Sequence, residues 1–87
     1  MSKIVYEQGF LKTVAGLPKA VQVRTALSLE WLSVDAFDSR LHTKPLKGEL
    51  AGLYSLRIGR EYRILFQFID KDTIQVFDVG HRREIYR

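Results

Sequence analysis

The second half of the chain contains three consecutive runs with the two-residue hydrophobic period of β-strands. The runs cover residues 53–58, 62–69 and 73–79, and turn-forming residues at Gly59 and at positions 70–72 separate them. The last run is apolar on both of its faces, which predicts that this strand lies inside the sheet. A chain with this pattern is constrained to form a small antiparallel sheet.

The first half predicts a short strand over residues 3–6 and two helices over residues 8–17 and 19–33. Pro18 separates the helices and fits the first turn of the second one, where its missing N–H costs nothing. The apolar residues at helical spacing are Phe10, Val14 and Leu17 in the first helix and Val23, Leu27 and Trp31 in the second. Two amphipathic helices joined by a tight break indicate a helical hairpin.

Residues 34–50 are irregular, and we expect a loop with one helical turn there. The order β-α-α-β-β-β predicts an α+β fold, in which the N-terminal helical hairpin packs on one face of a small, mainly antiparallel sheet. We expect residues 1–87 to form a single domain.

The alternation assigns the sheet residues to two faces. The residues expected to face the helices are Tyr54, Leu56, Ile58, Ile64, Phe66 and Phe68. Ser55, Arg57 and Arg63 then share the opposite, uncovered face. His81 and Arg82 follow the last strand and are expected close to that face.

The net charge of +4 is concentrated in the second half of the chain. Residues 1–43 carry five Lys and Arg against four Asp and Glu, whereas residues 44–87 carry nine against six. Such a surface favours a polyanion, either nucleic acid or an acidic protein segment, although a net charge of this size is equally typical of an ordinary solvated surface.

The composition excludes several classes of site. The chain has no cysteine and only two histidines, and no carboxylate cluster has the spacing of metal ligands, so we expect neither a metal nor a cofactor. No glycine-rich phosphate loop is present. No apolar run is long enough to span a bilayer and the N-terminus does not resemble a signal peptide, so we expect a cytoplasmic protein.

Metal-free cleavage of a phosphodiester is compatible with the residues that remain. It needs cations for the crowded phosphorane, which arginine forks supply, and a proton-transfer group, for which His81 is suited because imidazole titrates near neutrality. Tyr86 could stack on an RNA base. Each of these residues also has an ordinary interpretation, since Arg63 could pair with Glu61 or Asp70, and the last residues could be a solvated end of the chain.

Several motifs together resemble the RelE/ParE superfamily of type II toxin–antitoxin toxins. The resemblance extends over nearly the whole chain and rests on the helix break at Leu17–Pro18, followed by LKG (46–48), YSLRIG (54–59), YRI (62–64) and GHRREIY (80–86). The last motif is more similar to the messenger-cleaving RelE branch than to the gyrase-poisoning ParE branch.

The resemblance implies a toxin that cleaves messenger RNA in the ribosomal A site, with the 2′-OH as nucleophile and without a metal. The implied catalytic residues, together with our choice of His81 for proton transfer, are Arg57, Arg63, His81, Arg82 and Tyr86. Residues expected to contact RNA of the ribosome are Lys44, Lys47, Arg60 and Arg83. The chain departs from the family pattern at Ser55 and Arg57, where lysines occur in relatives.

Partners and alternatives follow from the same resemblance. We expect an acidic cognate antitoxin, a free toxin that is monomeric, and a hetero-oligomer of the two. One alternative function is ParE-like inhibition of DNA gyrase. Another is a catalytically weakened toxin that only binds its antitoxin.

Overall fold

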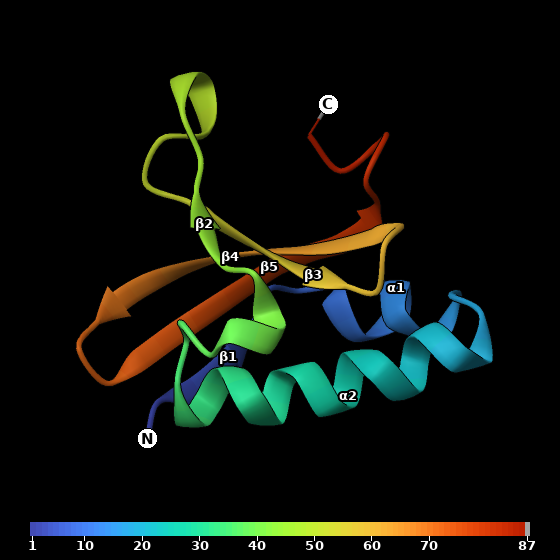
Figure 1. Ribbon diagram of the computed structural model, residues 1–87, viewed down its shortest axis with the longest axis horizontal. Helices are drawn as coiled ribbons and strands as arrows, with labels where there is room; N and C mark the ends of the chain where they lie inside the picture. Colours follow the sequence, from blue (N-terminus) through green and yellow to red (C-terminus); the bar gives the residue numbers. More distant parts are fainter. Residues whose placement is uncertain (87) are drawn as a thin grey trace.

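The structure is a computed structural model that describes residues 1–86. It contains a five-stranded sheet with two helices and two short 3₁₀ turns (Figure 1). In chain order the elements are β1 (Lys3–Tyr6), α1 (Phe10–Ala15), α2 (Lys19–Val34), η1 (Ser39–Leu41), β2 (Lys44–Pro45), η2 (Gly48–Leu50), β3 (Tyr54–Ile58), β4 (Tyr62–Asp70) and β5 (Thr73–His81). The predicted α+β class and the order of the main elements are confirmed.

The sheet has the strand order β1-β5-β4-β3-β2. The strands β2 to β5 pair in antiparallel fashion, and β1 adds in parallel to β5 after the chain has passed through both helices. The doubly apolar strand β5 therefore lies between β1 and β4, as its sequence predicted.

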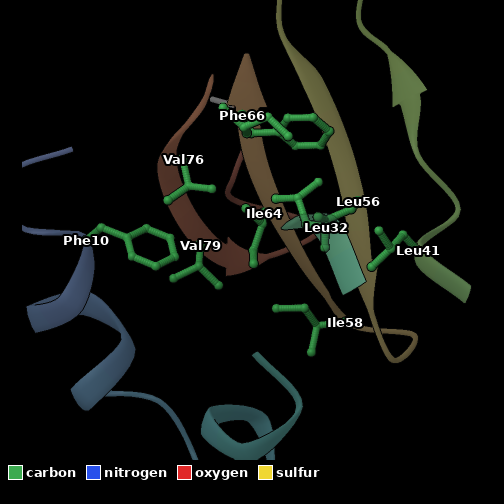
Figure 2. Close-up of a cluster of buried hydrophobic side chains, with 10 residues drawn as sticks. Phe10, Leu32, Leu41, Leu56, Ile58, Ile64, Phe66, Val76 and Val79 are labelled. Atoms are coloured by element: carbon green, nitrogen blue, oxygen red, sulfur yellow. The ribbon is translucent and has the colours of Figure 1, made fainter. Parts of the chain in front are cut away.

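Both helices lie on the same side of the sheet, below it in Figure 1. They cover a core of buried side chains, most of which are drawn in Figure 2. The core members are Phe10, Leu32, Leu41, Leu56, Ile58, Ile64, Phe66, Ile74, Val76 and Val79. Within residues 1–86 both helices lie on this face, so the opposite face of β3, β4 and β5 is not covered by a helix (Figure 1).

The predicted apolar line of the second helix is not its buried face. Val23 and Leu27 are 66% and 42% exposed, whereas Thr25, Ser28 and Leu32 are buried. Burial of Thr25 is possible because its hydroxyl donates a hydrogen bond of 2.7 Å to the carbonyl of Val21. A small side chain with an internal partner thus lets α2 approach the sheet closely.

The segment between α2 and β3 is more ordered than a loop with one helical turn. It forms η1, the short edge strand β2, and η2. Asp38 caps η1 by accepting hydrogen bonds from the backbone N–H and the side chain of Arg40. These bonds lower the pKa of Asp38 to about 2. The capped turn inserts Leu41 fully into the core.

Within residues 1–86, no helix combines the length and the hydrophobicity that crossing a membrane requires.

Candidate functional site

Two arginines face each other on the uncovered side of the sheet. Arg57 of β3 and Arg63 of β4 are directly paired in the register, and Gly80 of β5 continues the same row. Nη1 of Arg63 donates hydrogen bonds to the carbonyls of Arg60 and Tyr62, at 3.2 and 2.9 Å. The prediction that Arg57 and Arg63 share this face is confirmed, and Arg63 pairs with backbone carbonyls rather than with a carboxylate.

The neighbouring row contains Ser55, Leu65 and Asp78, and Lys44 of β2 is the partner of Ser55 on its other side. Ser55 is only 1% exposed, so the expectation that it contributes to the open surface is wrong. Strands flank it on both sides, and its short side chain does not reach beyond its neighbours. Side chains of cross-strand partners project to the same face of a sheet. Lys44 of β2 therefore places a lysine beside Ser55 of β3.

The chain folds back over the uncovered face after β5. The backbone N–H groups of Glu84 and Ile85 both donate to the carbonyl of His81, at 2.9 and 3.0 Å. Ile85 is buried, and its Cδ1 lies 3.4 Å from the position that a Cβ on Gly80 would occupy. The side chain of Ile85 therefore packs against the end of the arginine row. We call residues 82–86 the C-terminal turn.

The imidazole of His81 does not lie on the uncovered face. His81 is paired with Tyr62, whose side chain packs against the core, and the two rings contact each other edge to face. Nε2 lies 2.9 Å from a carboxylate oxygen of Glu61, and Nδ1 accepts a hydrogen bond from the backbone N–H of Arg83. The expected position of His81 is thus wrong, because β5 continues to His81 and strand alternation places its side chain on the same face as that of Val79 in the core.

Arg82 and Tyr86 lie on the C-terminal turn. The backbone N–H of Arg82 donates to the carbonyl of Glu61 at 2.7 Å, and its Nε lies 3.8 Å from the Glu61 carboxylate. These contacts fix the turn to the β3–β4 connection. Tyr86 is 38% exposed, although the preceding Ile85 is buried. An anchored backbone with an exposed aromatic ring is the arrangement that stacking on a base requires.

The four residues expected to bind RNA of the ribosome are all exposed, but they are spread over three segments. These residues are Lys44, Lys47, Arg60 and Arg83. The segment 46–53 and the C-terminal turn both extend to the side of the sheet that faces away from the helices (Figure 1). Arg60 lies in the connection between β3 and β4.

Sequence reasoning missed two arginines beside Arg57. Arg24 of α2 and Arg40 of η1 line one pocket together with Arg57 and Trp31. The pocket has a volume of about 300 Å³. The sequence did indicate that Arg24, Ser28 and Trp31 lie on one face of α2, because they have the i, i+4, i+7 spacing of a helix. The approach of η1 and β3 to that face is a tertiary feature with no local signature.

A second hollow is mainly apolar and lies among β1, α1 and α2. Its volume is about 410 Å³. Its apolar lining residues are Ile4, Tyr6, Phe10, Leu11, Val14, Ala26 and Leu29. Leu11 is 63% exposed at its rim.

Comparison with known proteins identifies the family. The model of the ParE toxin of type II toxin–antitoxin systems (parDE) matches residues 4–86. The chain belongs to this toxin family. The resemblance to the RelE/ParE superfamily is thereby confirmed.

Two individual relatives match different shares of the chain. The toxin is 47% identical over 45 residues to Toxin RelG of Mycobacterium tuberculosis, a match over 51% of each chain, so it spans about half the length of that relative. The RelE–RelB structure from Methanococcus jannaschii is similar with a TM-score of 0.74 and 28% identity, over 94% of both chains.

Another structure supports the fold alone. The archaeal RelE–RelB complex from Pyrococcus horikoshii is similar to the toxin with a TM-score of 0.78 at 23% identity, over 95% of this chain and 97% of that one.

Proposed function

We propose that this toxin is an endoribonuclease that cleaves messenger RNA in the ribosomal A site and so stops translation. The observation that carries the proposal is the cross-strand pair of arginines, Arg57 and Arg63, on the sheet face that the helices of residues 1–86 leave uncovered. The anchored C-terminal turn borders this pair, because Ile85 packs on Gly80 in the same row. The site offers cations and an aromatic ring on a rigid sheet.

In the proposed reaction, the 2′-OH of a ribose gives its proton to water and its oxygen attacks the adjacent phosphorus. The bond to the 5′ oxygen breaks and that oxygen takes a proton from water, which leaves a 2′,3′-cyclic phosphate and a 5′-OH. Negative charge accumulates on the phosphoryl oxygens in the transition state. Arg63 and Arg57 would bind these oxygens, because a planar guanidinium donates paired hydrogen bonds to phosphate and keeps its charge. Arg82 would add a third cation from the C-terminal turn, and Tyr86 would stack on a neighbouring base.

His81 has a positioning role in this account. Its Nδ1 accepts the N–H of Arg83 and its Nε2 contacts Glu61, so the ring holds the C-terminal turn against the β3–β4 connection. Proton transfer by His81 would require both contacts to open. Lys44, which lies across from Ser55, would supply an ammonium group where relatives have a lysine on the strand.

Binding to the ribosome would use phosphate contacts from the exposed cations. Lys44, Lys47, Arg60 and Arg83 are the proposed contributors. Each contact with a phosphate releases counterions, so association with ribosomes should weaken steeply as the salt concentration rises. An affinity that stays constant between low and physiological salt would argue against this role.

We also propose that an antitoxin with an acidic, initially disordered segment neutralises the toxin. The solved relatives in complex with RelB support a protein partner of this kind. The acidic segment would cover the uncovered basic face, and an amphipathic helix would fit the apolar hollow among β1, α1 and α2. Leu11→Glu should then weaken neutralisation by a co-expressed antitoxin without reducing toxicity, whereas Lys12→Glu, on the exposed side of α1, should change neutralisation far less.

A second function, inhibition of DNA gyrase, is favoured by one observation, namely that the matching family model is that of the ParE toxin. The two functions can be separated directly. Purified toxin is added in parallel to a coupled translation reaction and to a gyrase supercoiling reaction. The proposal predicts loss of intact messenger in the first reaction and unchanged supercoiling in the second. The reverse result would assign the toxin to the gyrase-directed function.

A further inference from the structure

The pocket beside Arg57 lies where α2 and η1 meet the free edge of β3. The strand β2 pairs only with Tyr54 and Ser55, so the edge of β3 is open beyond them. The residues that line the pocket are Arg24, Leu27, Ser28, Trp31, Arg40, Arg57 and Gly59. Three arginines therefore contribute to one part of its lining, and a tryptophan and a leucine contribute to another.

The three arginines differ in how they are paired. Arg40 is held by Asp38 through two hydrogen bonds, at 3.0 and 2.8 Å, and its guanidinium lies 3.9 Å from the centre of the Trp31 ring. In the part of the chain that the structure describes, Arg24 and Arg57 form no ion pair with a carboxylate. The charge of Arg40 is therefore balanced by Asp38, and Arg24 and Arg57 contribute two positive charges without a carboxylate partner among the described residues.

The position of Arg24 depends on the turn between β3 and β4. Gly59 has a φ of 63°, in the left-handed region that favours glycine, and a Cβ there would lie 3.3 Å from Nη1 of Arg24. Because residue 59 is glycine, no side chain of the turn stands between the backbone and the guanidinium of Arg24. This geometry brings a cation from α2 to the same strand end that carries Arg57.

We propose that this pocket binds one nucleotide of a single-stranded RNA, with its phosphate between Arg24 and Arg57 and its base against Leu27 and the part of Trp31 that Arg40 leaves free. The inference rests on the proposed function, since it treats RNA as the substrate. The carboxylate of an acidic peptide would satisfy the two charges but would leave most of the 300 Å³ empty. A nucleotide supplies both an anion and a flat apolar surface, which match the two kinds of wall.

Arg57 joins this pocket to the proposed cleavage site. It is paired with Arg63 on the uncovered face and also lines the pocket at the strand edge. An RNA strand that crosses the arginine row would therefore reach the pocket with a nucleotide that flanks the scissile phosphate. The pocket residues other than Arg57 would fix the register of the strand without taking part in bond breaking.

Trp31 is the only tryptophan of the chain and lines the pocket, so in the folded protein its fluorescence reports on binding there. The toxin is titrated at constant ionic strength with a trinucleotide RNA whose riboses carry 2′-O-methyl groups, which prevents cleavage. Inorganic phosphate and a glutamate-rich peptide of equal charge are titrated separately. Arg24→Gln is the test variant. Lys19→Gln is the matched control, because it removes the same charge from an exposed position on the same helix.

The RNA should change Trp31 fluorescence in a saturable way. Arg24→Gln should weaken this binding about tenfold or more, as loss of a hydrogen bond to a charged group does, and Lys19→Gln should weaken it much less. Three results would overturn the inference: no fluorescence response to RNA, equal effects of the two substitutions, or a response to the peptide that depends on Arg24 while RNA gives none.

The titration requires no catalysis, so the two proposals can fail separately. Suppose that the toxin binds RNA in a saturable, Arg24-dependent way but does not cleave messenger on ribosomes. This result would support nucleotide binding in the pocket and contradict the proposed nuclease function. Normal cleavage by Arg24→Gln, combined with unchanged RNA binding, would remove the pocket and leave the nuclease function intact.

Discussion

Arg57 and Arg63 are directly opposite each other on adjacent strands, yet the two arginines have different further neighbours. Arg63 turns back to the carbonyls of the β3–β4 connection, and Arg57 lines the pocket beside α2. Like charges in directly opposed positions destabilise a sheet. The pairing of Arg57 with Arg63 therefore lowers the stability of the sheet locally, and binding of an anion between them would relieve this repulsion.

Replacement of Arg57 should separate stability from activity. In Arg57→Thr the like-charge pair is gone and a residue with a high β-propensity takes its place, so the free energy of unfolding should rise by ~0.2–1 kcal/mol. Cleavage of messenger should become slower at the same time. Urea denaturation followed by Trp31 fluorescence measures the first effect, and a lower unfolding midpoint would contradict the proposed repulsion.

Arg63→Ala should abolish toxicity while the protein stays folded. Loss of one transition-state cation costs about 100-fold or more in rate. The two carbonyls that Arg63 bonds are in or near an exposed connection, where water can replace it, so unfolding should change little. Growth of cells that express the variant is compared with Lys71→Ala, an exposed cation in the β4–β5 turn. If Arg63→Ala is as toxic as the parent, Arg63 has no catalytic role.

The C-terminal turn offers a contrast between two adjacent residues. Tyr86→Ala should slow cleavage on ribosomes strongly and leave stability nearly unchanged, because its ring is partly exposed and its stacking on a base contributes roughly 1–3 kcal/mol. Ile85→Ala should affect both properties, since Ile85 is buried and its truncation costs about 2 kcal/mol. The turn has no functional role if deletion of residues 85–87 leaves the rate of cleavage unaltered.

The Asp38–Arg40 pair makes a specific prediction for acid stability. Hydrogen bonds from Arg40 hold the pKa of Asp38 at about 2, below its usual value of 3.8. A carboxylate with a depressed pKa stabilises the fold above its unfolded pKa, and this contribution disappears as the pH falls from about 4 towards 2. Asp38→Asn should therefore flatten the decline of the unfolding midpoint over this range. An unchanged decline would show that other carboxylates determine it.

Much of the fold was predictable because its signals are local. The three alternating runs, the break at Pro18 and the doubly apolar β5 each specify an element without reference to the rest of the chain. The buried face of α2 was not predictable from hydrophobicity. Thr25 is in the core because it bonds the carbonyl of Val21, while Val23 stays at the surface.

The site was predictable only where strand alternation determines it. Alternation placed Arg57 and Arg63 correctly, but it does not predict exposure, and Ser55 is buried although it belongs to the same alternating set. His81 was misplaced because β5 extends beyond the apolar run to include it. The pocket that Arg24 shares with Arg57 was missed because it depends on how α2 meets the β3 edge.

The most direct test of the central claim is to map the 5′ ends of messenger RNA after purified toxin is added to translating ribosomes. Our account predicts new 5′ ends within the codon that occupies the A site, none on the same messenger without ribosomes, and none with Arg63→Ala. Messenger that stays intact on ribosomes in the presence of excess wild-type toxin would contradict it.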